Sequence, residues 1–256
     1  MVSIEVKGNI EANEYQDALA LKSILARTFG EGVNGNILII SNTTLFGYQV
    51  TDIDLIVIGK LSGYATIVNT RHKRKKANGF EEFEFEKRRV VVRNFCFVIE
   101  TKRHGICDIR MDGIHLKVRY NGYYSDATTQ SERQKYSLKN FFCDRLNRSP
   151  FICNFIWLRN ANWSSIKGLI ADEKLRNHNY LPDTFSFQWL IQLACIQDIP
   201  YTPENSPYSV FNAFGKDSKL EIDVFRKTFD LFLNIREGSG QLTRKRIEQI
   251  TSKLLD

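Results

Sequence analysis

Residues 90–102 read VVVRNFCFVIETK, and this stretch decides the fold. Valine, isoleucine and phenylalanine dominate it, which favours a β-strand because β-branched and aromatic side chains pack well on a pleated surface. A second apolar run, IDLIVI at residues 53–58, precedes it in the chain. Both runs have the length and composition of strands and are bordered by polar residues. We therefore expect two strands of one sheet, each with charged residues at one end.

The remaining sequence mixes helical and strand patterns. Before residue 160 we expect a helix over 11–29, a strand over 34–41, a hairpin over 107–120 with Asp112-Gly113 as its turn, a helix over 128–146 and a strand over 151–158. After residue 160 we expect helices over 186–196, 220–235 and 242–255. This order predicts an α/β fold with a core at 1–160 and a mainly helical portion at 161–256 packed on it.

Composition narrows the functional classes. The chain has 256 residues and a formal net charge of +7, which favours a polyanionic partner because cationic surface releases counterions from phosphates. The cysteines form no CxxC pair and the histidines no HExxH motif, which argues against a disulfide framework and zinc hydrolysis. The longest apolar runs are too short to span a membrane, and the acidic start is unlike a signal peptide. We expect a soluble cytoplasmic protein without membrane association.

Three charged residues at the strand ends form the candidate site. Glu100 and Lys102 share one face of their strand because side chains alternate. Asp54 shares a face with Ile56 and Ile58, so it points to the packed side, where a carboxylate is costly unless it is paired or binds a cation. If the strands are neighbours, Asp54 and Glu100 meet as an oxygen-rich site suited to Mg²⁺ or Mn²⁺.

Such a site suits phosphodiester hydrolysis, in which a metal polarises the phosphate and lowers the pKa of a bound water. Lys102 could orient or deprotonate that water, or offset charge in the transition state. Alternatively, Asp52 and Asp54 are solubilising residues of an edge strand, and Glu100 with Lys102 an exposed pair. Their joint position at the ends of two apolar strands favours the metal site, with Asp52 as the fallback ligand.

The order of these motifs resembles the NERD (nuclease-related) branch of the PD-(D/E)xK nuclease superfamily. The matches cover about residues 8–160: Glu14 in the first helix, the strand at 36–41, TDIDLIV at 51–57, VIETK at 98–102, and QSERQ at 130–134. The resemblance implies a restriction-endonuclease-like core, a central mixed sheet flanked by helices. It also implies that Asp54 and Glu100 bind metal and that Lys102 is the catalytic lysine.

By the same resemblance, Glu14 would be an auxiliary acidic residue and Gln130 a polar group facing the site. Glu11 is an alternative to Glu14, and Gln134 lies one helical turn from Gln130. The sequence departs from the family pattern in three ways. Asp52 replaces a glutamate, an isoleucine rather than a proline precedes Asp54, and the segment between the two motif strands is long.

That long segment, residues 61–89, is a basic insertion. The alternation in FEFE at 83–86 predicts an exposed hairpin arm. Its cations are candidate contacts to a nucleic-acid backbone: Arg71, Lys73, Arg74, Lys75 and Lys76. A solvated loop is the alternative interpretation. For the tyrosines at 120, 123 and 124, aromatic packing at a hairpin end explains the pattern better than base stacking.

The sequence thus predicts a Mg²⁺-dependent nuclease, or one that uses Mn²⁺, acting on DNA, with RNA left open. The resemblance adds expectations: a role in DNA processing or anti-phage defence, and gating by a protein partner or homo-oligomer. The alternative from another class is a non-catalytic nucleic-acid-binding or protein-assembly module that retains the nuclease fold.

Overall fold

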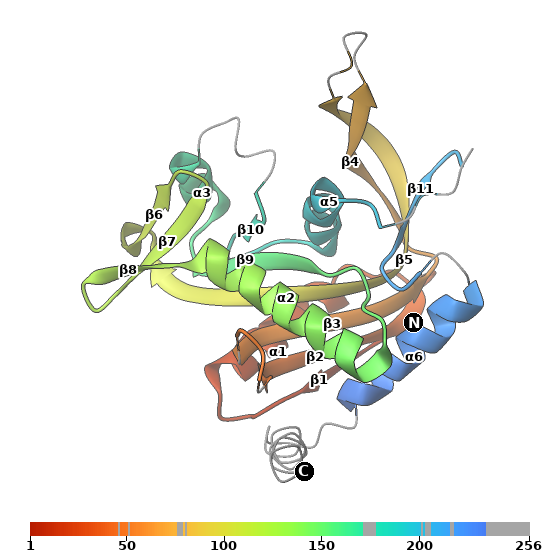
Figure 1. Ribbon diagram of the computed structural model, residues 1–256, viewed down its shortest axis with the longest axis horizontal. Coiled ribbons are helices and arrows are strands. Elements are labelled where there is room, and N and C mark those ends of the chain that lie inside the picture. The colour runs from red at the N-terminus through yellow and green to blue at the C-terminus, as the bar shows by residue number, and fades with distance from the viewer. Residues whose placement is uncertain are drawn as a thin grey trace, which may run out of the picture.

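The computed structural model is an α/β protein (Figure 1). A central mixed sheet of eight strands is flanked by five α-helices in the described part of the chain, and a three-stranded antiparallel sheet lies beside it. The structure describes residues 1–45, 47–50, 52–75, 79, 81–170, 178–200, 202, 206–215 and 218–233, without the side chains of 71–75, 81–85 and 218–222. The predicted α/β class with a central mixed sheet is confirmed.

The elements follow one another along the whole described chain. The strands of the large sheet are β1 (Val2–Lys7), β2 (Asn34–Thr44), β3 (Asp52–Ser62), β4 (Ala65–Lys75), β5 (Glu81–Gly105), β9 (Cys153–Asn160), β10 (Tyr180–Leu181) and β11 (Ser209–Asn212). The small sheet contains β6 (Ile109–Asp112), β7 (His115–Tyr120) and β8 (Tyr123–Asp126), preceded by the 3-10 turn η1 (Ile106–Asp108). The helices are α1 (Asn13–Ala26), α2 (Ala127–Leu146), α3 (Trp163–Leu169), α5 (Phe187–Gln197) and α6 (Ser218–Leu233).

Strand β5 is the longest described strand and pairs with four others, β3, β4, β9 and β11. It is 25 residues long, and the sheet order is β1-β2-β3-β5-β9-β10, with β4 and β11 also paired to β5. Strands β3 and β4 follow one another along β5, both antiparallel, with Lys60 opposite Asn94 and Ala65 opposite Val91. Strands β9 and β11 pair with β5 in parallel. The second half of β5 therefore lies in the sheet, while its first half forms an arm with β4 (Figure 1).

Alternation along β5 divides the core into two layers. Phe97 and Ile99 pack on the side covered by α1 and α5, which we term the α1 face. Cys96 and Val98 pack on the side covered by α2 and α6, which we term the α2 face. All four side chains are fully buried. The same alternation continues past Ile99, so it directs Glu100 and Lys102 to the α2 face.

Several predicted elements are confirmed. β3 and β5 are neighbours, the Asp112-Gly113 turn joins β6 to β7 with Gly113 at φ 61°, and β4 and β5 form the hairpin predicted within residues 61–89. The backbone of residues 71–75 lies in this hairpin, whereas the side chains of Arg71, Lys73, Arg74 and Lys75 and the whole of Lys76 lie outside the described residues.

The described portion after residue 160 contains the helices α3, α5 and α6 and two short strands that were not predicted. Strand β10 pairs with β9 and β11 pairs with β5, so this portion also contributes to the sheet. The predicted helix at 242–255 lies outside the described residues. Within the part that the structure describes, no helix has both the length and the apolar character needed to cross a membrane.

Candidate active site

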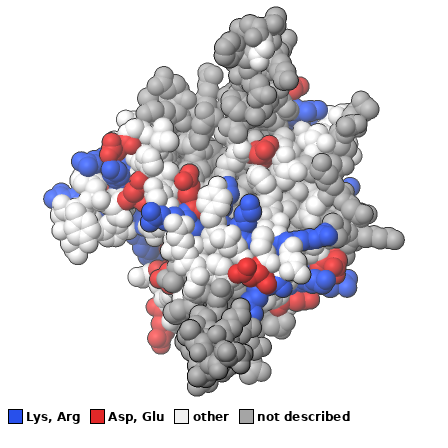
Figure 2. Space-filling model, in the orientation of Figure 1, with Lys and Arg blue, Asp and Glu red and all other residues white. Residues whose placement is uncertain are grey.

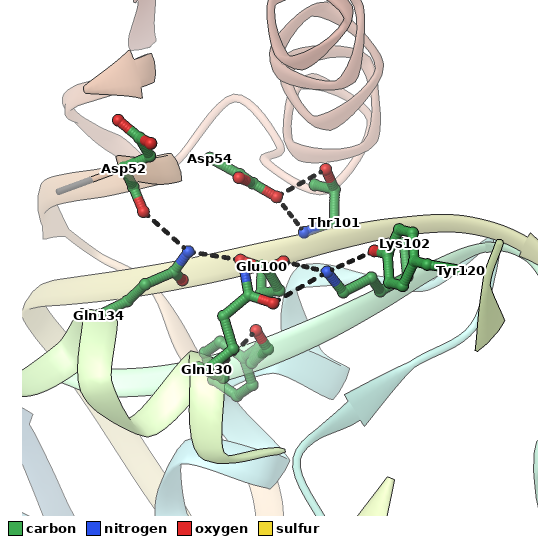
Figure 3. Close-up of polar contacts among 10 residues, drawn as sticks. Asp52, Asp54, Glu100, Thr101, Lys102, Tyr120, Gln130 and Gln134 are labelled. Carbon is green, nitrogen blue, oxygen red and sulfur yellow. Dashed lines mark hydrogen bonds and ion pairs between the residues drawn. The ribbon is translucent and has the colours of Figure 1, made fainter. Parts of the chain in front are cut away.

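Glu100 and Lys102 lie together near the carboxyl end of β5, as predicted (Figure 3). Lys102 Nζ donates a hydrogen bond to Glu100 Oε1, and the two side chains are only 6% and 1% exposed, respectively. Burial of this pair contradicts the alternative in which it is an exposed surface pair. Because water does not solvate either charge, each one depends on the other, and loss of one partner would leave a buried unpaired charge.

Asp54 of β3 lies near enough to this pair for both charges to act on it, but its side chain bonds to Thr101, the residue between them. Asp54 Oδ2 accepts hydrogen bonds from the Thr101 backbone N–H at 2.7 Å and from Thr101 Oγ1 at 3.0 Å (Figure 3). The carboxylate thereby takes the place of a backbone acceptor where β3 leaves β5. Asp54 Oδ1 makes no hydrogen bond within the described part of the chain. Asp52, the fallback ligand, is exposed and accepts from Thr44 Oγ1 at 3.3 Å.

Helix α2 covers the pair with two glutamines one turn apart, Gln130 and Gln134. Gln130 Oε1 accepts from Lys102 Nζ at 3.1 Å. Gln134 Nε2 donates to Glu100 Oε2 and, at 3.1 Å, to the backbone carbonyl of Asp52. The helix is set in place by its N-cap, because the Asp126 side chain accepts from the backbone N–H at position 129 at 2.9 Å. Gln130 thus contacts the ammonium of the pair, and Gln134 its carboxylate.

Two aromatic residues complete the surroundings of Lys102; the sequence analysis assigned Tyr120 to aromatic packing at a hairpin end and did not single out His104. Tyr120 Oη accepts from Lys102 Nζ at 2.9 Å, and its ring meets that of His104 edge to face with centroids 4.4 Å apart. Tyr120 comes from β7, next to the tight Asn121-Gly122 turn into β8. His104 could have been found by strand alternation, since it lies two residues beyond Lys102.

Electrostatics mark this group as short of positive charge. Burial and the nearby charge of Glu100 raise the pKa of Asp54 to about 7, although Thr101 and Lys102 act in the opposite direction. Burial alone would lower the pKa of Lys102, but Glu100 and Tyr120 outweigh it, and the net pKa is raised. Lys102 is therefore a cation at neutral pH. We term Asp54, Glu100 and Lys102 the carboxylate site, which contains two carboxylates and one ammonium: Lys102 bonds to Glu100, and Asp54 is held by Thr101.

The donor set fits a magnesium or manganese ion. Gln134 is fully buried, and its Oε1 atom has no hydrogen-bond partner among the described residues, so an acceptor oxygen is left over beside Glu100. The described part contains no group of three or more acidic, histidine or cysteine side chains able to hold a metal. Two carboxylates are nonetheless a usual protein contribution to a Mg²⁺ site, where water and phosphate oxygens supply the other ligands.

Helix α1 places a different acid at the sheet from the one predicted. Glu14 is half-buried and makes no hydrogen bond or ion pair within the described residues, so its auxiliary role stays a prediction; Glu11 is exposed. The buried acid is Asp17, 1% exposed, which binds Arg103 and Arg159. Its position one turn before the buried leucine at 21 was the available signal, since it falls on the helix's apolar face.

No protein-family model, curated protein or solved structure matches this chain. The functional argument therefore depends on the residues of the site. They offer a buried group of Glu100, Lys102 and two glutamine side chains, with the half-buried carboxylate of Asp54 held by Thr101 next to it. This arrangement is suited to binding a divalent cation and stabilising negative charge beside it.

Proposed function

We propose that this protein is a metal-dependent nuclease that hydrolyses phosphodiester bonds of DNA. The observation that carries the proposal is the geometry where β3 leaves β5: buried Glu100 is bonded to Lys102 and Gln134, and Thr101 holds the carboxylate of Asp54 beside it. A desolvated acidic pair of this kind is costly for the fold unless it binds a ligand. The resemblance to the NERD branch supports the same activity, and with it a role in DNA processing or anti-phage defence.

Asp54 and Glu100 would hold the cation. Thr101 fixes one carboxylate through its backbone N–H and hydroxyl, and Gln134 fixes the other through its amide. Such supporting hydrogen bonds orient metal ligands and limit their rearrangement. When bound, Mg²⁺ or Mn²⁺ supplies polarisation of the phosphate and a water of lowered pKa.

Lys102 acts as a fixed positive charge. Its raised pKa keeps the ammonium protonated at neutral pH, which argues against a role as general base. Hydrogen bonds to Glu100, Gln130 and Tyr120 fix its position. Preorganised donors of this kind stabilise the charge that develops on phosphate oxygens without reorganisation during the reaction. Of the roles considered from the sequence, charge stabilisation and water orientation remain.

A cleavage assay tests the proposal. Plasmid and single-stranded DNA are incubated with the wild type and with Glu100→Gln in Mg²⁺, Mn²⁺ or EDTA. The matched control is Glu132→Gln, which removes an exposed acid of α2 two residues away from both Gln130 and Gln134. We expect wild-type and control cleavage in either metal, none in EDTA, and a loss of about 100-fold or more in Glu100→Gln. Metal-independent cleavage, or equal activity of Glu100→Gln and the wild type, would contradict the proposal. No cleavage by the wild type, with DNA binding intact, would favour a non-catalytic binding module.

A further inference from the structure

A second charged cluster lies on the opposite face of β5. Arg103 Nη2 and Nε contact the two carboxylate oxygens of Asp17 at 2.8 and 3.3 Å, and Arg159 Nε contacts Asp17 Oδ1 at 2.8 Å. We term these three residues the arginine cluster. They come from β5, α1 and β9, three elements that meet only in the folded chain.

The guanidinium groups of this cluster are held in place. Arg103 Nη2 also donates to the backbone carbonyl of Asn13 at 2.9 Å. The guanidinium of Arg159 lies over the ring of Trp157, 4.1 Å from its centroid. Asp17 itself is fully packed, with 1% exposure. Arginines that are anchored on one side lose little further freedom when a ligand binds on the other.

One buried carboxylate needs only one arginine to neutralise it, yet two are present. The surplus cation has donors available. Nη1 of Arg103 and both Nη atoms of Arg159 make no hydrogen bond within the described part of the chain. The two side chains are 44% and 24% exposed. A pair of partly exposed guanidinium forks with a net positive charge matches the oxygens of a phosphate group.

The position of the cluster relates it to the carboxylate site. Arg103 directly follows Lys102, and it lies about 7 Å beyond Thr101 on the same face of the strand. Thr101 is the residue that holds Asp54. In the view of Figure 2, basic and acidic side chains are interspersed, and the visible described residues form no continuous basic patch.

We propose that Arg103 and Arg159 bind a backbone phosphate of the DNA strand next to the one that is cleaved. This inference rests on the proposed nuclease function, because it assigns a substrate contact to the same strand end. The ligand is a phosphodiester, and the contact carries no base specificity.

Binding measured without cleavage tests the inference. A labelled DNA duplex is titrated in EDTA with the wild type, Arg103→Gln, Arg159→Gln and Arg226→Gln, and the dissociation constant is followed over NaCl concentration. Arg226 is an exposed arginine on α6, away from β5's carboxyl end. Each single variant of the cluster keeps the other arginine on Asp17, so the carboxylate stays paired; thermal melting verifies that each is folded.

We expect each cluster variant to weaken binding about fivefold and to lower the slope of log Kd against log[NaCl] by about 0.9, the value for one phosphate contact. Arg226→Gln should leave the slope unchanged. Equal slopes in the wild type and both cluster variants would overturn the inference and identify the cluster as a structural ion-pair network only. That outcome leaves the nuclease proposal intact. Conversely, if the wild type binds DNA but does not cleave it in Mg²⁺ or Mn²⁺, the nuclease proposal fails and the DNA contact of the cluster still stands.

Discussion

The two faces of β5 carry charged clusters of opposite imbalance. The carboxylate site sets two acids against one lysine, with Glu100 and Lys102 on the α2 face and Asp54 bonded to Thr101; on the α1 face, the arginine cluster sets two arginines against one acid. Both are built around a carboxylate that is about 1% exposed, Glu100 or Asp17. In a purely structural ion pair we expect equal numbers of acids and bases. The extra carboxylate of one cluster therefore points to a cation as ligand, and the extra arginine of the other to an anion.

The largest expected effect is a difference in cleavage rate between variants of two adjacent residues, Lys102 and Arg103, which lie on opposite faces of β5. Lys102→Met should lower the rate of cleavage about 100-fold or more, because it removes the ammonium that stabilises phosphate charge. Arg103→Met should lower kcat/KM only about fivefold, because it removes a contact to a phosphate that does not react. Steady-state kinetics on a short duplex measure both. Equal losses would show that the two faces are not functionally distinct.

The next effect concerns stability on the α1 face. Asp17→Asn removes the charge that holds two guanidinium groups between α1, β5 and β9, so we expect the free energy of unfolding to fall by about 2–3 kcal/mol. Denaturant titration at pH 7 measures it. The variant should still bind Mn²⁺ with wild-type affinity, since the carboxylate site is unchanged; an unaltered unfolding midpoint would contradict this account of the cluster.

Asp54→Asn should have the opposite effect on stability in the absence of metal. The pKa of Asp54 is about 7 in the folded protein and 3.8 for an unperturbed aspartate, so the folded state binds more protons between these values. The wild type therefore loses stability as pH rises from about 4 through 7, and the asparagine variant does not. We expect the variant's advantage to grow by about 1–3 kcal/mol between pH 4 and pH 8.

Denaturation in EDTA at each pH measures that advantage. Asparagine retains a carbonyl oxygen that can accept from Thr101, so the hydrogen bonds of Asp54 Oδ2 are preserved. Adding Mn²⁺ should stabilise the wild type at pH 8 and leave the variant unchanged. A stability difference that does not vary with pH would be inconsistent with a desolvated, partly protonated Asp54.

The smallest effect comes from the aromatic neighbour of Lys102. Tyr120→Phe removes the hydroxyl that accepts from Lys102 Nζ at 2.9 Å but keeps the ring against His104. We expect kcat to fall about three- to fivefold, because Glu100 and Gln130 still hold the ammonium. The dissociation constant for DNA should not change. A change in DNA affinity without a change in kcat would place Tyr120 on the substrate instead.

The carboxylate site could be predicted from sequence because it depends on local rules. Strand alternation places Glu100 with Lys102, and helical spacing places Gln130 with Gln134. Asp54 needed one further assumption, that two consecutive apolar strands are neighbours, and the register of β3 on β5 confirms it.

The arginine cluster was not predictable in this way. Arg103 and Arg159 lie 86 and 142 residues from Asp17, and their meeting depends on the parallel pairing of β9 with β5 and on the packing of α1. The short strand β11 was missed for a related reason. Its four residues show no usable periodicity, and their strand conformation follows from pairing with β5.

The central claim is that Asp54 and Glu100 together bind a divalent cation. Calorimetric titration with Mn²⁺ at about pH 7.5 tests it most directly. The account predicts one ion bound per chain in the wild type, loss of that binding in both Asp54→Asn and Glu100→Gln, and retention in Asp17→Asn. Absence of Mn²⁺ binding by the wild type, or unchanged binding by either carboxylate variant, would contradict it.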